Sequence, residues 1–92
     1  MKHVAERLLR GEVVRFRPRG NSMSPRVESG EEVEVFPCGG SAEVGDVVFC
    51  RVRGRYLLHL VTAVFPDGRY QISNNRGHVN GATKQILGKL ME

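Results

Sequence analysis

Short stretches of alternating apolar and polar residues, separated by turn-forming residues, run through most of this chain and constrain its fold more than any other feature. Such alternation places apolar side chains on one face of a strand and polar side chains on the other. Strands are predicted over residues 12–19, 31–36, 46–52, 55–65, 69–73 and 84–90, with turns at 37–41, 53–54, 66–68 and 80–81. Strands at intervals of roughly 8–12 residues, without helices between them, are typical of a coiled antiparallel sheet or a partly open barrel.

One short amphipathic helix is predicted before the first strand. Val4 and Leu8, flanked by Ala5 and Leu9, form its apolar face, and Gly11 ends it. The 92 residues have room for a single domain, 1–92, with a thin core. The alternation on each strand predicts a core of Val14, Phe16, Met23, Val33, Val35, Val48, Cys50, Val61 and Ile86. We therefore expect a mostly-β fold, a partly open, coiled antiparallel β barrel preceded by one short helix.

Composition narrows the class of protein and its compartment. With 40% hydrophobic and 26% charged residues, the chain has the balance of an ordinary soluble globular protein. It contains neither an apolar run of membrane-spanning length nor the pattern of a signal peptide, so a cytoplasmic location without a membrane partner is expected. Cys38 and Cys50 have no CxxC spacing and no histidine at zinc-ligand spacing, so neither a metal nor a cofactor is expected. Two free thiols suit a reducing compartment, although a disulfide between them stays open.

The charges of this basic chain, whose net charge is +4, follow the strand pattern. Arginines alternate at 15, 17 and 19 and again at 51, 53 and 55, which places each trio on one face of its strand. The stretch 28–46 contains six acidic residues and neither Lys nor Arg. The arginines can attract phosphates, or they can form solvated faces that the acidic stretch partly neutralises across the sheet. We expect the second, and nucleic acid is not an expected partner.

The segment GNSMSP (20–25) is the most informative stretch for chemistry. It lies between two predicted strands, so its hydroxyl groups lie on a loop that rigid neighbours hold, as suits a nucleophile. Ser24 and Pro25 also match the start of a helix, with Ser as the N-cap and Pro at the first helical position. This segment alone leaves both interpretations open.

Six segments in order extend the pattern: GNSMSP (20–25), SGEEVEV (29–35), VGDVV (44–48), LLHLV (57–61), SNNRG (73–77) and LGKL (87–90). Together, over about residues 17–90, they resemble the catalytic domain that bacterial signal peptidases share with LexA-type repressors. The resemblance implies that fold and a serine endopeptidase activity on an extended peptide. In that clan the serine before Met attacks the peptide carbonyl, and a Lys, or a His in one type, takes its proton. Only 21 residues precede Ser22, so we expect neither a membrane anchor nor the repressor's DNA-binding domain.

Carried over by position, the resemblance makes Ser22 the nucleophile and His59 the general base. No lysine lies between Lys2 and Lys84, so the lysine version of the dyad is excluded. A neutral imidazole can accept a serine proton near pH 7. The resemblance further implies substrate contacts for Met23 and Pro25, and a supporting role beside His59 for a loop at 73–77, where this chain carries Asn74, Asn75 and Arg76.

Three positions depart from the family pattern. His59 is followed by Leu60 instead of an arginine, and the later loop has asparagines where the family has an aspartate. Gly20 stands where signal peptidases often have a hydroxyl group for the oxyanion, a role that the backbone N–H of Ser22 can take. His78 can act as a second polar group in the loop, or can simply face solvent.

These departures leave a second function open. A catalytically degenerate relative would keep the fold as a peptide-binding or dimerisation module. The expected partner is a peptide or protein substrate, and a homodimer is a further partner to consider.

Overall fold

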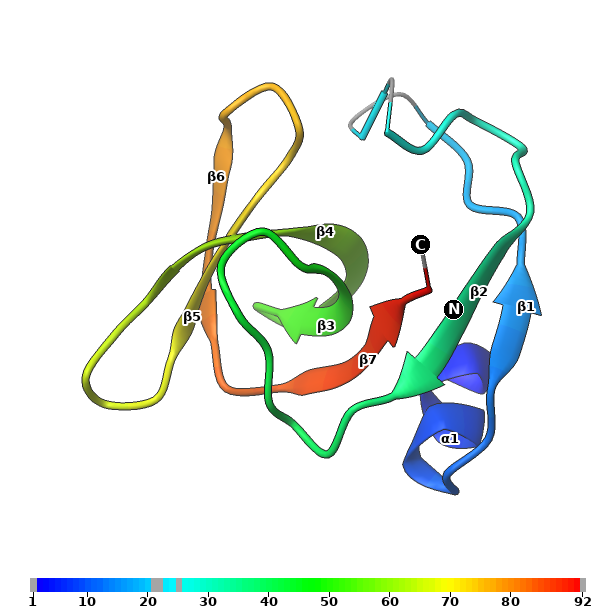
Figure 1. The fold of residues 1–92 in the computed structure, drawn as a ribbon, viewed down its shortest axis with the longest axis horizontal. Coiled ribbons are helices and arrows are strands. Elements are labelled where there is room, and N and C mark those ends of the chain that lie inside the picture. Colours follow the sequence, from blue (N-terminus) through cyan, green and yellow to red (C-terminus); the bar gives the residue numbers. More distant parts are fainter. Residues whose placement is uncertain (1, 21–22, 25, 92) are drawn as a thin grey trace.

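The computed structural model describes residues 2–20, 23–24 and 26–91. Within these ranges one helix precedes the strands, as predicted (Figure 1). The elements are α1 (Lys2–Leu9), β1 (Val14–Phe16), β2 (Val33–Pro37), β3 (Val47–Val52), β4 (Arg55–Val64), β5 (Tyr70–Ser73), β6 (Val79–Thr83) and β7 (Ile86–Leu90). Gly11 follows α1 with a φ of 84°, the left-handed conformation that ends helices.

The strands form one antiparallel sheet in the order β1-β2-β7-β3-β4-β5-β6. The last strand, β7, lies between β2 and β3 and so joins the N-terminal hairpin to the rest of the sheet (Figure 1). An ion pair of 3.1 Å between Lys89 Nζ on β7 and Asp46 Oδ2, just before β3, strengthens this junction. The mostly-β, antiparallel and open character of the predicted fold is confirmed, because β1 and β6 are the two edges of the described sheet.

The core has two parts, one on each side of the sheet. Val4, Ala5 and Leu8 of α1 pack with residues of β1, β2, β3 and β4 in the first part, which includes Val47 and Phe49. The second part contains Val48, Cys50 and Val52 from β3, together with Val61, Ile72 and Ile86. Alternate residues of β3 thus enter opposite clusters, and this central strand is buried on both faces. Eight of the nine predicted core residues are buried. The ninth, Phe16, is half-buried, and its ring packs edge-on against that of Phe49 with 5.9 Å between the ring centroids.

One predicted turn is wrong. Asn80 and Gly81 were expected to form a turn because Asn–Gly favours the left-handed conformations of hairpin loops. They lie instead within β6, where Gly81 pairs with Ile72 of β5. Gly81 has a φ of 147°, and a Cβ atom on it would lie 2.9 Å from Val52 Cγ1. Glycine is needed here because β6 passes close to the end of β3.

The first predicted strand is shorter than expected, with Val14–Phe16 observed in place of 12–19. Glu12 is held at the helix end by ion pairs of 3.0 Å with Arg7 and Arg10. Pro18 has no N–H to donate to a ladder, so the strand ends before it. The predicted charge neutralisation is confirmed on this edge, where Arg15 and Arg17 pair with Glu34 and Glu32 at 2.8 and 3.7 Å.

Candidate active site

β4 has an unpaired backbone edge beside the predicted general base. Residues Arg55–Leu60 pair with β3 on one side, whereas pairing with β5 on the other side begins only at Leu60. In the described ranges, no strand therefore covers the second edge of β4 between Arg55 and His59. Such an edge can accept an extended peptide as an additional strand.

His59 is buried on β4, with 9% of its surface exposed, and its ring has a defined tautomer. Nδ1 lies 2.7 Å from the backbone oxygen of Leu58. Because a carbonyl oxygen only accepts hydrogen bonds, Nδ1 carries the proton and Nε2 is left with its lone pair. Burial lowers the pKa of His59 below its ordinary value of 6.5, the bond to Leu58 opposes this shift, and a nearby His78 charge adds to it. The imidazole is therefore held neutral, with Nε2 as the available base.

The described residues on either side of positions 21–22 are anchored to the segment 27–30. The N–H of Gly20 donates to Ser29 Oγ at 3.1 Å, and the N–H of Gly30 donates to Pro18 O at 2.8 Å. On the other side, the N–H of Val27 donates to Met23 O at 2.9 Å. Ser22 and Pro25 themselves lie outside the described residues.

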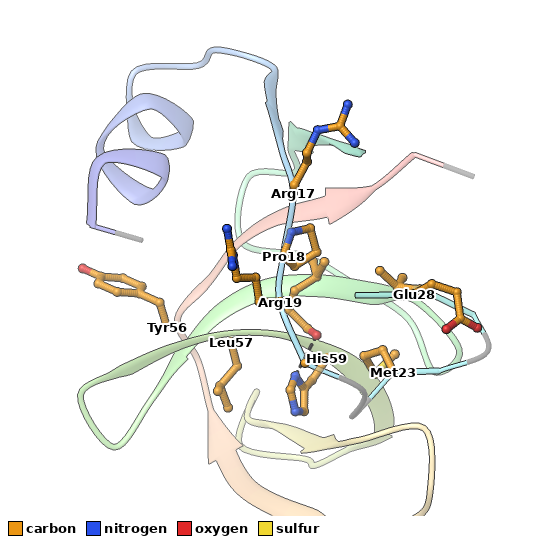
Figure 2. Close-up of a pocket in the computed structure, with 11 residues that line it drawn as sticks. Arg17, Pro18, Arg19, Met23, Glu28, Tyr56, Leu57 and His59 are labelled. Atoms are coloured by element: carbon orange, nitrogen blue, oxygen red, sulfur yellow. Dashed lines mark hydrogen bonds between the residues drawn. The ribbon is translucent and has the colours of Figure 1, made fainter. Parts of the chain in front are cut away.

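A cavity of about 450 Å³, here called the Met23 cavity, lies between this anchored loop and β4 (Figure 2). Gly20 and Met23, the described residues nearest to Ser22 in sequence, both line it together with His59. Its remaining lining residues are Arg17, Pro18, Arg19, Val27, Glu28, Tyr56, Leu57 and Leu58. Figure 2 shows the chain through Arg17, Pro18 and Arg19 crossing β4 beside His59. Most of the cavity surface is apolar, with Met23, Val27 and Leu58 among its lining residues, so it suits an apolar side chain.

A second cavity of about 620 Å³, here called the Arg55 cavity, also reaches His59. Its lining residues are Arg19, Val52, Arg53, Arg55, Leu57, His59, His78, Val79 and Asn80. His78 is exposed to solvent, as one of the two interpretations of this residue expected, and it also lines this cavity beside His59. Arg19, Leu57 and His59 are thus shared by the two cavities, and the half of β4 that lacks pairing with β5 contributes residues to both.

The loop between β5 and β6 contacts the serine-bearing segment through Asn75. Its Nδ2 donates a hydrogen bond of 3.2 Å to the backbone oxygen of Ser24. Asn74 Oδ1 accepts hydrogen bonds from the N–H groups of Arg76 and His78 at 2.9 and 3.0 Å and so fixes the turn. Arg76 is exposed. Neither asparagine side chain bonds to His59 among the described contacts, so their supporting role stays a prediction.

Ser24 does not act as a helix cap. Its hydroxyl group lies 3.1 Å from both carboxylate oxygens of Glu28, and the described residues from 23 to 28 form turns without a helix. This pairing also gives Glu28, which lines the Met23 cavity, a hydroxyl partner.

Sequence reasoning missed several lining residues, namely Arg19, Val27, Glu28, Arg53, Arg55 and Leu57. For Arg55 and Leu57 a signal was present, because both share the strand face of His59 at a spacing of two. Val27 and Glu28 gave no comparable signal, since the loop that brings them to β4 has no periodic pattern.

Metal ligation and thiol reactivity have little support in the part of the chain that the structure covers. No group of acidic, histidine and cysteine residues could hold a metal ion there. Cys38 and Cys50 are free thiols, and burial raises the pKa of Cys50 to about 12, so that thiol stays protonated and unreactive. No helix within the same ranges is long and apolar enough to cross a membrane.

No model of a protein family matches the sequence, and no curated protein matches it.

Proposed function

We propose that this chain is a serine endopeptidase domain of the signal peptidase and LexA type. In this proposal Ser22 Oγ attacks the carbonyl carbon of an extended peptide while its proton passes to His59 Nε2. The same proton is then given to the leaving amine as the C–N bond breaks, and water hydrolyses the resulting acyl-enzyme. Met23 and Pro25 contact the substrate, and Asn74, Asn75 and Arg76 support the site.

The observation that carries this proposal is the state of His59. Its Nδ1 proton is bound by the carbonyl of Leu58, so Nε2 is free to accept a proton, and burial keeps the ring neutral. In triad proteases a carboxylate performs the orienting role. Here the carbonyl supplies orientation without a full negative charge, so the imidazolium formed during attack is stabilised less.

The surroundings of His59 supply a binding mode for the substrate. The free edge of β4 offers backbone hydrogen bonds to a peptide, and the cavities on both sides of His59 receive its side chains. Gly20 and Met23 line the same cavity as His59, which favours an encounter between this base and the intervening Ser22.

The direct test is hydrolysis of a peptide library together with labelling by a serine-reactive acylating probe. Cleavage and a mass adduct on the peptide that contains Ser22 are expected from the wild type, and neither from Ser22→Ala. A wild type that neither cleaves nor labels under conditions in which it is folded would refute the enzymatic proposal.

One observation favours a second candidate, a catalytically degenerate peptide-binding or dimerisation module. His59 contacts no carboxylate among the described residues, and the segment 73–81, which includes the loop between β5 and β6, contains no acidic residue. Tight peptide binding, or a dimer in sedimentation, without any turnover or labelling would favour this candidate.

A further inference from the structure

The arginines of this chain differ in whether they have a counter-ion. Arg7, Arg15 and Arg69 each lie within 3.0 Å of a carboxylate oxygen. Arg19, Arg53 and Arg55 form no ion pair with any carboxylate of the described residues. These latter arginines come from two distant parts of the sequence.

Arg51 and Arg76 also have no ion pair among the described residues, but they do not line either cavity. By contrast, Arg19, Arg53 and Arg55 all line the Arg55 cavity. His59 and His78 also line it, and its described lining contains neither Asp nor Glu. A concave site with charges of one sign concentrates the electrostatic field and attracts a ligand of the opposite sign. The arrangement therefore favours an anionic group within this cavity.

We propose that the Arg55 cavity binds a carboxylate side chain of the peptide ligand, so that the preferred peptide carries Asp or Glu. This inference rests on the peptide-binding part of the proposed function and not on its chemistry. The planar guanidinium groups of Arg53 and Arg55 can each bind a carboxylate through two parallel hydrogen bonds.

The geometry of β4 gives the acidic residue a position relative to an apolar one. Arg55, Leu57 and His59 share one face of the strand and line the Arg55 cavity, and Leu57 and His59 also reach the Met23 cavity. Tyr56 and Leu58, on the other face, line only the Met23 cavity, and Arg55 lines only the Arg55 cavity. Successive side chains of an extended peptide also point to opposite faces. The preferred peptide therefore has an apolar residue next to an acidic residue.

Two features favour a peptide over a nucleic acid as the source of the anion. The described lining of the Arg55 cavity contains no Phe, Tyr or Trp ring, the large aromatic surfaces on which successive bases stack. Its lining includes Asn80, whose Oδ1 is buried without a hydrogen-bond partner within the described structure. The oxygen of a side-chain amide can accept a hydrogen bond from a peptide N–H, and its nitrogen can donate one to a carboxylate.

The test measures binding separately from catalysis. Fluorescent peptides with a central Leu-Glu pair, a Leu-Gln pair or a spaced Leu-Ala-Glu sequence are titrated against the full chain carrying Ser22→Ala, at low and moderate salt. Because hydrogen bonds to charged groups are strong, Leu-Glu is expected to bind about tenfold or more tightly than Leu-Gln. The spaced peptide should lose most of that advantage.

Matched variants identify the cavity responsible. Arg53→Gln combined with Arg55→Gln should abolish the preference for Glu over Gln, whereas Arg53→Lys with Arg55→Lys should keep most of it. The control, Arg10→Gln with Arg69→Gln, removes the same charge from exposed, paired arginines outside both cavities and should leave the preference unchanged.

Three outcomes would overturn the inference: equal affinity for Glu and Gln peptides, an equal loss in the control, or competition in which a short single-stranded DNA displaces the peptide and binds more tightly. Selective binding without any hydrolysis by the wild type would support the acidic pocket while refuting the enzymatic proposal. Hydrolysis at the same rate for Glu and Gln peptides, together with equal affinity for both, would support the enzymatic proposal while refuting the acidic pocket.

Discussion

The Nδ1–H of His59 donates a 2.7 Å hydrogen bond to the backbone carbonyl oxygen of the preceding residue, Leu58. This bond uses an acceptor that the strand itself supplies, on the edge of β4 that no described strand covers. It orients the ring and sets its tautomer without any carboxylate. In the proposed Ser22–His59 dyad, the carbonyl group of Leu58 therefore takes the orienting role.

The pH dependence of hydrolysis follows from the burial of His59. Its pKa is lowered from 6.5, chiefly by desolvation of the charged form. Because the base must be neutral, kcat/KM should rise as the pH increases through a value below 6.5 and should then level off. A pH–rate profile and an NMR titration of the ring protons should report the same midpoint. An inflection above 6.5 that belongs to His59 would contradict the proposed environment.

Ser22→Ala and His59→Ala should each remove turnover to a similar extent, and the double variant should be no worse than either single variant. Groups that act as one unit lose their function together, so their effects are not additive. Steady-state hydrolysis of the best library peptide measures this, with peptide affinity as the folding control. Additive losses would mean that the two residues act independently.

Asn74→Asp should raise kcat if a missing carboxylate limits the rate. The substitution keeps the oxygen that accepts hydrogen bonds from the N–H groups of Arg76 and His78, so the turn should persist. A negative charge near an imidazolium stabilises it. The control is Asn74→Ala, which removes the acceptor and should lower stability without raising kcat. An unchanged kcat in a folded Asn74→Asp variant would refute a supporting role for this position.

Gly88→Ala should destabilise the fold by about 1–3 kcal/mol, because overpacking forces neighbouring atoms apart. An added Cβ would lie 2.7 Å from Val35 Cγ1 and 2.8 Å from the backbone oxygen of Phe36. Urea unfolding measures the change in the free energy of unfolding. In a Val35→Ala background the cost should be smaller, since one of the two clashes is gone. A neutral Gly88→Ala would contradict the close approach of β7 to β2.

Local pattern was sufficient for most of the fold. The alternation of apolar residues predicted all the strands except β6, and it identified core positions such as Val35, Val48 and Val61, because burial of one strand face is encoded every second residue. The helix and its end at Gly11 followed from equally local rules. Gly81 was misassigned because an Asn–Gly pair carries a turn signal whatever its surroundings, and only the packing of β6 against Val52 overrides that signal.

For the candidate site as well, some features followed from the sequence and others only from the tertiary structure. The sequence by itself supplied the residue types, a serine in a rigid loop and a histidine on a strand, and a resemblance gave them roles. Only the tertiary structure decided that Leu58 orients His59, that pairing of β5 stops at Leu60 and leaves an edge free, and that Arg19 meets Arg53 and Arg55 in one cavity. Hydrogen-bond partners, strand register and cavities arise between residues that are distant in sequence, and no local periodicity encodes them.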